Sequence, residues 1–230
     1  MTPSDHPTTA PARGAARRPV MLVFALGALV AACTHQPYDT AQMHYLTFNV
    51  PEPAGATAHV CHSYGCRKQT RVRFTADQLK TIAKLMRTTR KADTAAEERR
   101  AVAYAIGWIE RHVGKKIGTH SDRAGMDFTG AGDPGQQDCV DEATNTTSYL
   151  TILANAGLLK HHTVGVPFAK DNLLQGVAGW THWTAVLRET ETGKRWAVDS
   201  WIYKNGENPA VVETEKWYLS TLDRLPKATR

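Results

Sequence analysis

The feature that most constrains the fold is a pair of alternating segments, "THWTAVLRET" and "RWAVDSWIY", on either side of "ETGK". Alternation of apolar and polar residues with a period of two is typical of a half-buried strand. Two such segments joined by so short a turn predict an antiparallel hairpin. Because one face of such a hairpin is apolar, the rest of the chain has to supply a layer that covers it.

The segments that precede the hairpin have helical periodicity instead. Two capping boxes, T-x-x-Q and T-x-x-E, predict helices that begin after Thr75 and Thr94. Asp138 is the expected N-cap of a third helix, while Gly114 and Gly157 are the expected ends of the second and third. A further alternating segment, "HHTVGV", follows. Helices first and an antiparallel sheet afterwards predict an α+β fold.

The predicted hairpin brings a histidine and an aspartate together. If its turn is centred between Thr190 and Glu191, His182 lies directly opposite Asp199. Directly opposed residues have Cβ atoms about 4.5–5.5 Å apart, so an imidazole N–H can reach the carboxylate. The same register gives the reverse face two apolar pairs, Trp183 with Val198 and Ala185 with Trp196.

Cys139 occupies the first position of the third predicted helix. The first N–H groups of a helix are unpaired and its dipole is positive there, and both effects favour a thiolate. Cysteines in such places have pKa values of about 3.5–7.5 instead of about 8.5. The spare N–H groups, together with the side chain of Gln136 or Gln137, are candidates for an oxyanion hole. Cys139, His182 and Asp199 therefore form a candidate nucleophile, base and orienting acid.

Each of the three residues has an ordinary structural interpretation when it is taken alone. A cysteine in a helix is more often a packing residue, a histidine on a strand is more often a satisfied structural group, and an aspartate can merely accept from a backbone N–H. Their order along the chain, the position at the helix start and the match across the hairpin together favour the triad.

The segments "DCVDEA", "HWTAVL" and "WAVDSW" resemble the bacterial transglutaminase-like cysteine proteinases, over roughly residues 95–202. The resemblance implies a papain/transglutaminase-like fold, in which N-terminal helices and a nucleophile helix pack on an antiparallel sheet. By position, it makes Cys139 the nucleophile, His182 the base and Asp199 the orienting acid. Characterised members of that family act in the periplasm and cleave a large surface adhesin near its N-terminus.

The same family uses calcium, which acidic residues around the cysteine bind. Asp138 fits that pattern and Asp141 lies close, but the residue after the cysteine is Val140 where the family has an acid. Calcium is therefore a candidate cofactor held by Asp138 and Asp141, although nothing else in the sequence requires a cofactor.

The N-terminus has the order of a secretory signal: basic residues, then the apolar run "VMLVFALGALVAA", then a cysteine. The run is shorter than the about 20 apolar residues of a membrane-spanning helix. "VAAC" resembles the lipobox of bacterial lipoproteins, in which Cys33 is lipidated after cleavage. We therefore expect a signal peptide over 1–32, a Pro- and Thr-rich tether over 33–58, a peptidase domain over 59–230 and a lipid anchor that holds the protein to a membrane in the periplasm. An ordinary secretory signal is the alternative.

The remaining cysteines fit an oxidising compartment. Cys61 and Cys66 in "VCHSYGCR" predict a disulfide worth about 2 kcal/mol in the chain-entropy model, and a metal site that uses His62 is the weaker alternative. Without Asp5 and the three arginines of the signal, the formal net charge falls from +6 to +4. This mild basicity and the export signal argue against nucleic acid as a partner.

These features predict a cell-envelope thiol peptidase that cleaves a protein or peptide of the envelope through an acyl-enzyme. The alternatives are a peptidoglycan peptide amidase or endopeptidase, an acyl transferase that uses an amine in place of water, and a non-catalytic lipoprotein that keeps the fold as a binding scaffold. Four tryptophans bracket the proposed site and are candidates for lining a groove: Trp180, Trp183, Trp196 and Trp201.

Overall fold

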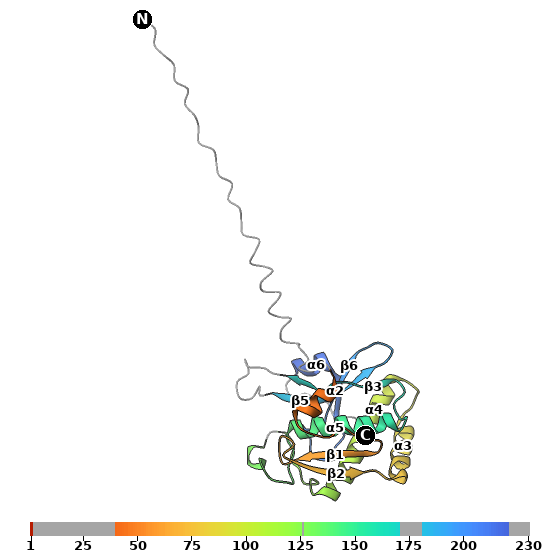
Figure 1. The fold of residues 1–230 in the computed structure, drawn as a ribbon. Coiled ribbons are helices and arrows are strands. Elements are labelled where there is room, and N and C mark those ends of the chain that lie inside the picture. The colour runs from red at the N-terminus through yellow and green to blue at the C-terminus, as the bar shows by residue number, and fades with distance from the viewer. Residues whose placement is uncertain (2–39, 126, 171–180, 221–230) are drawn as a thin grey trace. The chain divides into compact units, whose positions relative to one another are not determined.

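The computed structural model describes residue 1 and residues 40–125, 127–170 and 181–220. The predicted signal peptide, the lipidation candidate Cys33 and Trp180 lie outside the described residues. The described elements are α2 (Ala41–Thr47), β1 (Thr57–His62), β2 (Lys68–Arg73), α3 (Ala76–Thr89), α4 (Ala95–Ile117), η2 (Phe128–Gly130), α5 (Cys139–Asn155), β3 (His162–Val164), β4 (Phe168–Lys170), β5 (His182–Glu189), β6 (Arg195–Asp199), β7 (Ala210–Glu213) and α6 (Thr214–Leu219) (Figure 1).

Helix α5 lies between two sheets. It contacts strand β1 of the antiparallel hairpin β1–β2 and strand β5 of a larger sheet (Figure 1). Its interior is almost continuously buried from Asp141 to Leu153, so nearly every side chain of the helix has a packing or polar partner. The main core includes Ile106 and Ile109 of α4, Leu150 and Leu153 of α5 and Leu187 of β5. Burial of this core fixes the start of α5 relative to both sheets.

The larger sheet has five strands, and all its pairings are antiparallel. The strands β3, β5, β6 and β7 are neighbours in that order, while β4 pairs with the first half of β5. One face of β5 and β6 packs into the α5 core, and the other covers a second cluster around Phe168 and Trp217. Helices that precede and cover an antiparallel sheet make this an α+β fold, as the sequence predicts.

The register of the β5–β6 hairpin differs from the predicted one by two residues. Ala185 pairs with Val198, where Trp196 was expected, and Leu187 pairs with Trp196. The loop is longer than expected: Glu189 N–H donates to Lys194 O, so four residues separate the paired ends, and the last of them is Gly193 with φ +70°. Because the error is an even number of residues, every side chain stays on its predicted face.

The helix starts agree with the sequence, but one helix end does not. The side chain of Thr75 accepts from Gln78 N–H, and the side chain of Gln78 accepts from Thr75 N–H. These two hydrogen bonds form the predicted capping box. The Thr94 side chain also accepts from Glu97 N–H, but the predicted second capping box is incomplete because the Glu97 carboxylate accepts from Lys91 N–H instead. The predicted end of that helix at Gly114 is wrong, because α4 continues to Ile117 and ends at Gly118 with φ +93°. Gly114 serves a close contact instead, since a Cβ there would lie 3.1 Å from the backbone of His120.

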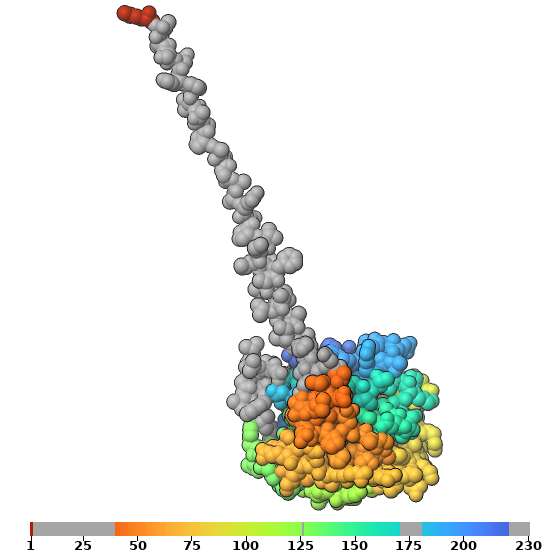
Figure 2. Space-filling view, viewed as in Figure 1, coloured from red at the N-terminus to blue at the C-terminus, as the bar shows by residue number. Residues whose placement is uncertain are grey.

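The expected irregular tether over 33–58 is wrong for its described part. Residues 41–47 form α2, whose Tyr45 is 3% exposed and shares a 3.0 Å hydrogen bond with Ser148 of α5. This segment, orange in Figure 2, lies directly against the rest of the folded body. Short helices with only two buried side chains give little periodicity in the sequence, which is why the segment resembled a linker.

Within the described ranges, no helix is long and apolar enough to cross a membrane.

Tyr45→Ala tests whether α2 belongs to the folded domain. Removal of a buried aromatic side chain costs about 3 kcal/mol or more, so we expect a loss of that size in the free energy of unfolding measured in urea. Met43→Ala is the matched control, because Met43 lies on the same helix but is 45% exposed. Equal stability of the two variants would mean that α2 is only a tether.

Candidate active site

His182 and Asp199 form a buried pair. His182 Nε2 lies 2.8 Å from Asp199 Oδ2, and both side chains are almost fully excluded from solvent. With the observed register the two residues are diagonal neighbours across the hairpin, a spacing that an imidazole still spans. The predicted contact is therefore present although the predicted pairing that led to it is wrong.

Trp217 completes the surroundings of this pair. Its Nε1–H donates to the same oxygen, Asp199 Oδ2, over 2.7 Å. The ring of His182 is close to two indoles, with its centroid 4.6 Å from Trp201 and 5.3 Å from Trp217. An Nε2–H that donates to Asp199 leaves Nδ1 as the basic nitrogen of the neutral ring. Nδ1 is buried and has no hydrogen-bond partner among the described residues.

Cys139 is the free cysteine of the described chain and lies at the first position of α5. Its Sγ is 3.6 Å from the carbonyl oxygen of Thr181, the residue directly before His182. Among the described residues no hydrogen bond joins Sγ to His182 itself. The half-buried thiol lines a cavity of about 330 Å³ together with Thr181, Trp183 and Trp201. The fold therefore brings the predicted nucleophile next to the segment that carries the predicted base.

The expected low pKa of Cys139 is wrong for this structure. Burial raises the pKa of the Cys139 thiol to about 12, and the carboxylate of Asp138 adds to this effect. The dipole of α5 does not compensate, because the Asp138 side chain already accepts from the N–H groups of Val140 and Asp141 at 3.1 and 2.9 Å. The same cap that starts the helix places a negative charge beside the sulfur, so the resting thiol is neutral and donates toward Thr181.

The two glutamines predicted for an oxyanion hole are used elsewhere. The Gln136 amide bonds the backbone of Arg123, Ser121 and Gly135, and the Gln137 amide donates to Cys61 O. Both side chains are buried in the loop that leads to α5. The N–H of Cys139 itself is the first-turn N–H without an acceptor among the described residues, since those of Val140, Asp141 and Glu142 all bond Asp138. That N–H is therefore a candidate oxyanion donor.

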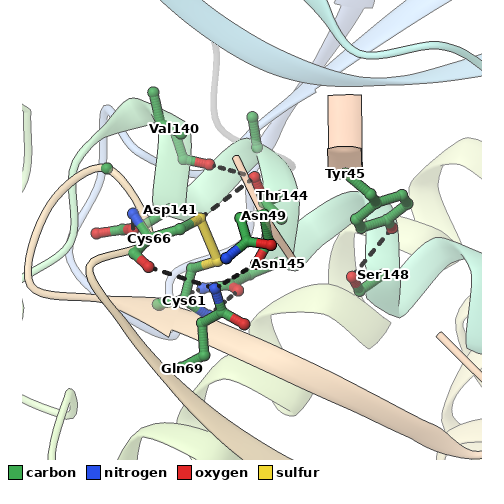
Figure 3. The surroundings of a disulfide bond; sticks show 12 residues. Tyr45, Asn49, Cys61, Cys66, Gln69, Val140, Asp141, Thr144, Asn145 and Ser148 are labelled. Atoms are coloured by element: carbon green, nitrogen blue, oxygen red, sulfur yellow. Dashed lines mark hydrogen bonds between the residues drawn. A yellow bond between two sulfur atoms is a disulfide. The ribbon is translucent and has the colours of Figure 1, made fainter. Parts of the chain in front are cut away.

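The loop that the Cys61–Cys66 disulfide closes holds the start of α5 in place (Figure 3). Asp141 accepts from Cys66 N–H at 2.6 Å and Tyr64 N–H at 2.8 Å, while Asp138 accepts from Gly65 N–H at 2.9 Å. Ser63, Tyr64, Gly65 and Cys66 all have positive φ, between 56° and 75°. Three consecutive N–H groups can point at two carboxylates only because this turn is left-handed, a conformation that costs free energy at residues other than glycine.

The same hydrogen bonds argue against the predicted calcium site at Asp138 and Asp141. Calcium takes 6–8 oxygen ligands, and here every oxygen of both carboxylates accepts from at least one backbone N–H. Those donors present positive charge where a cation would bind. Asp141 also lies within 4.8 Å of Cys61 and Cys66, but their sulfurs are bonded to each other and are not thiolate ligands. The residues do not fit a metal.

Several buried carboxyl groups surround the site. Glu142 on α5 accepts from Ser200, the residue after Asp199, at 2.8 Å. Burial raises the pKa of Glu142 to about 8 and that of Asp122 to about 7, and it raises the pKa of Glu110 well above its ordinary value. Burial and the neighbouring Asp138 also raise the pKa of Asp141, to about 8, while its three N–H donors act in the opposite direction. Protons are therefore shared among these groups near neutral pH.

Sequence reasoning missed two residues of the site. Trp217 lies in a short segment, "TEKWYL", that has no clear periodicity, and only its contact with Asp199 reveals it. Tyr64 lines the cavity, and its hydroxyl donates to Asp127 O over 2.5 Å. Of the candidate groove tryptophans, Trp183 and Trp201 line the cavity. Trp196 does not, because its ring packs 3.5 Å under the Arg99 guanidinium.

Comparisons with known proteins add no relative: neither a scan against protein-family models nor searches of curated proteins and of solved structures found a match to this chain.

We expect removal of the disulfide to destabilise the protein by about 2 kcal/mol, the chain-entropy estimate for so short a loop, and by more where the left-handed turn also relaxes. The measurement is urea unfolding of Cys61→Ser/Cys66→Ser against the oxidised wild type. Cys139→Ala is the control and should unfold like the wild type within about 1 kcal/mol, because the substitution removes only one small side-chain atom, the half-buried sulfur. Unchanged stability of the double variant would show that the loop holds nothing in place.

We also expect stability to fall as the pH rises from 6.5 to 8. Asp141 and Glu142 keep their protons in the folded state up to about pH 8, whereas they lose them at about 4 in the unfolded chain. The folded state therefore binds more protons in this window, and each such group lowers the free energy of unfolding by about 1.4 kcal/mol per pH unit. His44 acts in the opposite direction, because burial lowers its pKa from 6.5 to about 4 in the folded state. Its effect raises the free energy of unfolding between pH 4 and 6.5 and changes little above that range.

Thermal unfolding of Glu142→Gln over the same pH range provides the check. Its melting temperature should fall less steeply with pH than that of the wild type, because glutamine cannot ionise but keeps an acceptor for Ser200. Glu215→Gln, on an exposed carboxylate of α6, should keep the wild-type slope. Parallel curves for all three proteins would contradict the assignment.

Proposed function

We propose that this protein is a thiol peptidase with a papain/transglutaminase-like site, in which Cys139 attacks, His182 transfers protons and Asp199 orients the imidazole. The observation that supports it most is the state of His182. Its Nε2 is fixed by Asp199, and its buried Nδ1 has no partner among the described residues. Most buried polar groups have a hydrogen-bond partner, whereas a general base needs one nitrogen free; His59 Nδ1 also lacks a hydrogen-bond partner among the described residues, so it is the combination of a free Nδ1 with the Nε2–Asp199 bond that supports the role of His182.

The proposed reaction starts from the neutral thiol. The Sγ proton passes to His182 Nδ1 as the sulfur attacks the carbonyl carbon of the peptide, and the charge on the carbonyl oxygen is stabilised by the N–H of Cys139. The imidazolium returns the proton to the leaving nitrogen, and the C–N bond breaks to leave a thioester. Water then gives a proton to Nδ1 and attacks the thioester, which releases the acid and regenerates the thiol.

Asp199 and Trp217 act on this cycle through His182. Asp199 stabilises the imidazolium each time it forms, and the Trp217 N–H holds the acceptor oxygen in place. The two indoles beside the ring exclude water, which strengthens the His182–Asp199 interaction. These roles give a reason for the aromatic side chains that surround His182.

We place the protein in the cell envelope, anchored in the periplasm through a lipid on Cys33, with a protein or peptide of the envelope as its substrate. The Cys61–Cys66 disulfide supports an oxidising compartment. A non-catalytic scaffold is the second candidate, and the raised pKa of Cys139 favours it.

Cleavage of a peptide pool separates the two candidates. Purified protein is incubated, without reductant, with peptides from a digested bacterial envelope fraction, and new C-termini are identified by mass spectrometry. The proposal expects new termini with wild type and none with Cys139→Ala. Equal patterns for wild type, Cys139→Ala and a blank would favour the scaffold and overturn the peptidase.

The pH dependence of Cys139 alkylation tests the thiol–imidazole pair. We expect iodoacetamide to modify wild type near pH 7, because His182 accepts the thiol proton. In His182→Ala the thiol has no base to accept its proton, and since burial raises the pKa of this thiol, modification should need a pH above about 9. Superimposable pH profiles of the two proteins would mean that His182 does not act on Cys139.

Trp217→Phe tests the second donor to Asp199. Loss of a hydrogen bond to a charged group is worth about 1.5–3 kcal/mol, so we expect kcat to fall about 10- to 100-fold with KM nearly unchanged. Tyr218→Phe, the neighbouring residue on α6, is the control and should keep the wild-type kcat. A rise in KM without a fall in kcat would place Trp217 in substrate binding instead.

A further inference from the structure

The cavity beside Cys139 has a preformed wall that is built from one loop. Gly125 N–H donates to Trp201 O at 2.7 Å, and the Tyr64 hydroxyl donates to Asp127 O at 2.5 Å. Gly130 packs so closely that a Cβ there would lie 2.8 Å from the Tyr64 hydroxyl. The backbone around η2 is thus tied at several points to the elements that position Cys139. Its shape does not depend on a ligand.

Aromatic and aliphatic side chains make most of this cavity. The lining includes the rings of Trp183, Trp201, Tyr64 and Phe128 and the aliphatic side chain of Val140. Phe128 is 67% exposed, although a large apolar side chain on a tied-down turn costs solubility and gains no packing. A site that binds an apolar group explains why this turn presents a phenylalanine.

The acidic residues of the cavity already have hydrogen-bond partners within the protein. Asp127 accepts from the Arg123 guanidinium and from Thr129. Asp138 accepts from three backbone N–H groups and caps α5. No lysine or arginine is among the described lining residues. What remains for a ligand is aromatic surface.

We propose that this cavity is a subsite for a large apolar, preferably aromatic, side chain next to the scissile bond. The proposal rests on the proposed function, since it places the substrate carbonyl at Cys139. The volume of about 330 Å³ lies at the low end of ligand sites, which span about 300–1,000 Å³. It suits one such side chain with its flanking backbone. Cell-wall stem peptides carry small and charged side chains, so the subsite favours a protein substrate over peptidoglycan.

Binding to Cys139→Ala tests the subsite without turnover. The ligands are capped pentapeptides of alanine with Phe, Leu, Ala, Asp or Lys in the middle, and tryptophan fluorescence reports their Kd. Burial of a large apolar side chain is expected to tighten binding at least about tenfold for Phe and Leu over Ala. Asp and Lys should bind no more tightly than Ala. Tighter binding of the Lys peptide would show that Asp127 and Asp138 remain available, and it would overturn the proposal, as would equal binding of all five.

Phe128→Ala in the same background is expected to lower the preference for Phe over Ala at least about threefold. Leu46→Ala, an equally exposed apolar residue at 65% on α2, should leave it unchanged. Equal effects of both variants would overturn the assignment of Phe128.

Failure of the subsite and failure of the peptidase are distinguishable. Selective binding without cleavage by wild type would contradict only the proposed function, whereas cleavage without preference for the central residue would contradict only the subsite.

Discussion

The carboxylate of Asp141 is the interaction on which the site depends. It is fully buried, and it accepts from the N–H groups of Tyr64, Cys66 and Asp138. The oxygens of one side chain therefore join the disulfide turn, the loop before α5 and the first turn of α5 itself. Because α5 packs against both sheets, these hydrogen bonds fix the position of Cys139 relative to β5. An exposed carboxylate could not do the same, since water would compete for each donor.

The surroundings of Cys139 also determine the chemistry of its thiol. Burial raises the pKa of Cys139 most, and Asp138, Asp199 and Asp141 raise it further when they are ionised. A helix N-terminus lowers a thiol pKa only when its N–H groups are free to face the sulfur. Here a carboxylate has already taken most of them. The site therefore favours transfer of a proton from thiol to imidazole during attack over a thiolate that exists beforehand.

Local rules predicted more of this protein than long-range ones. The N-caps Thr75, Thr94 and Asp138 were correct because a cap side chain and the backbone N–H that donates to it lie within one turn. The role of Gly114 was misjudged because its cause is a contact with His120 beyond the helix, which no local pattern reveals. Trp217 and the Tyr64 turn were missed for the same reason: each matters through one partner distant in sequence.

The His182–Asp199 pair shows why a wrong register still identified the right residues. The loop holds two more residues than expected, so the strands are displaced by an even number, and side chains on a strand alternate with a period of two. A displacement by one residue would have placed His182 and Asp199 on opposite faces. A hairpin prediction therefore identifies which side chains share a face whenever its register is correct to within an even number of residues. The exact pairing depends on the length of the turn. In this chain the turn is set by Gly193, whose positive φ closes the longer loop. A glycine near the end of such a loop, and not at its centre, is the signal by which the correct register could have been chosen from the sequence.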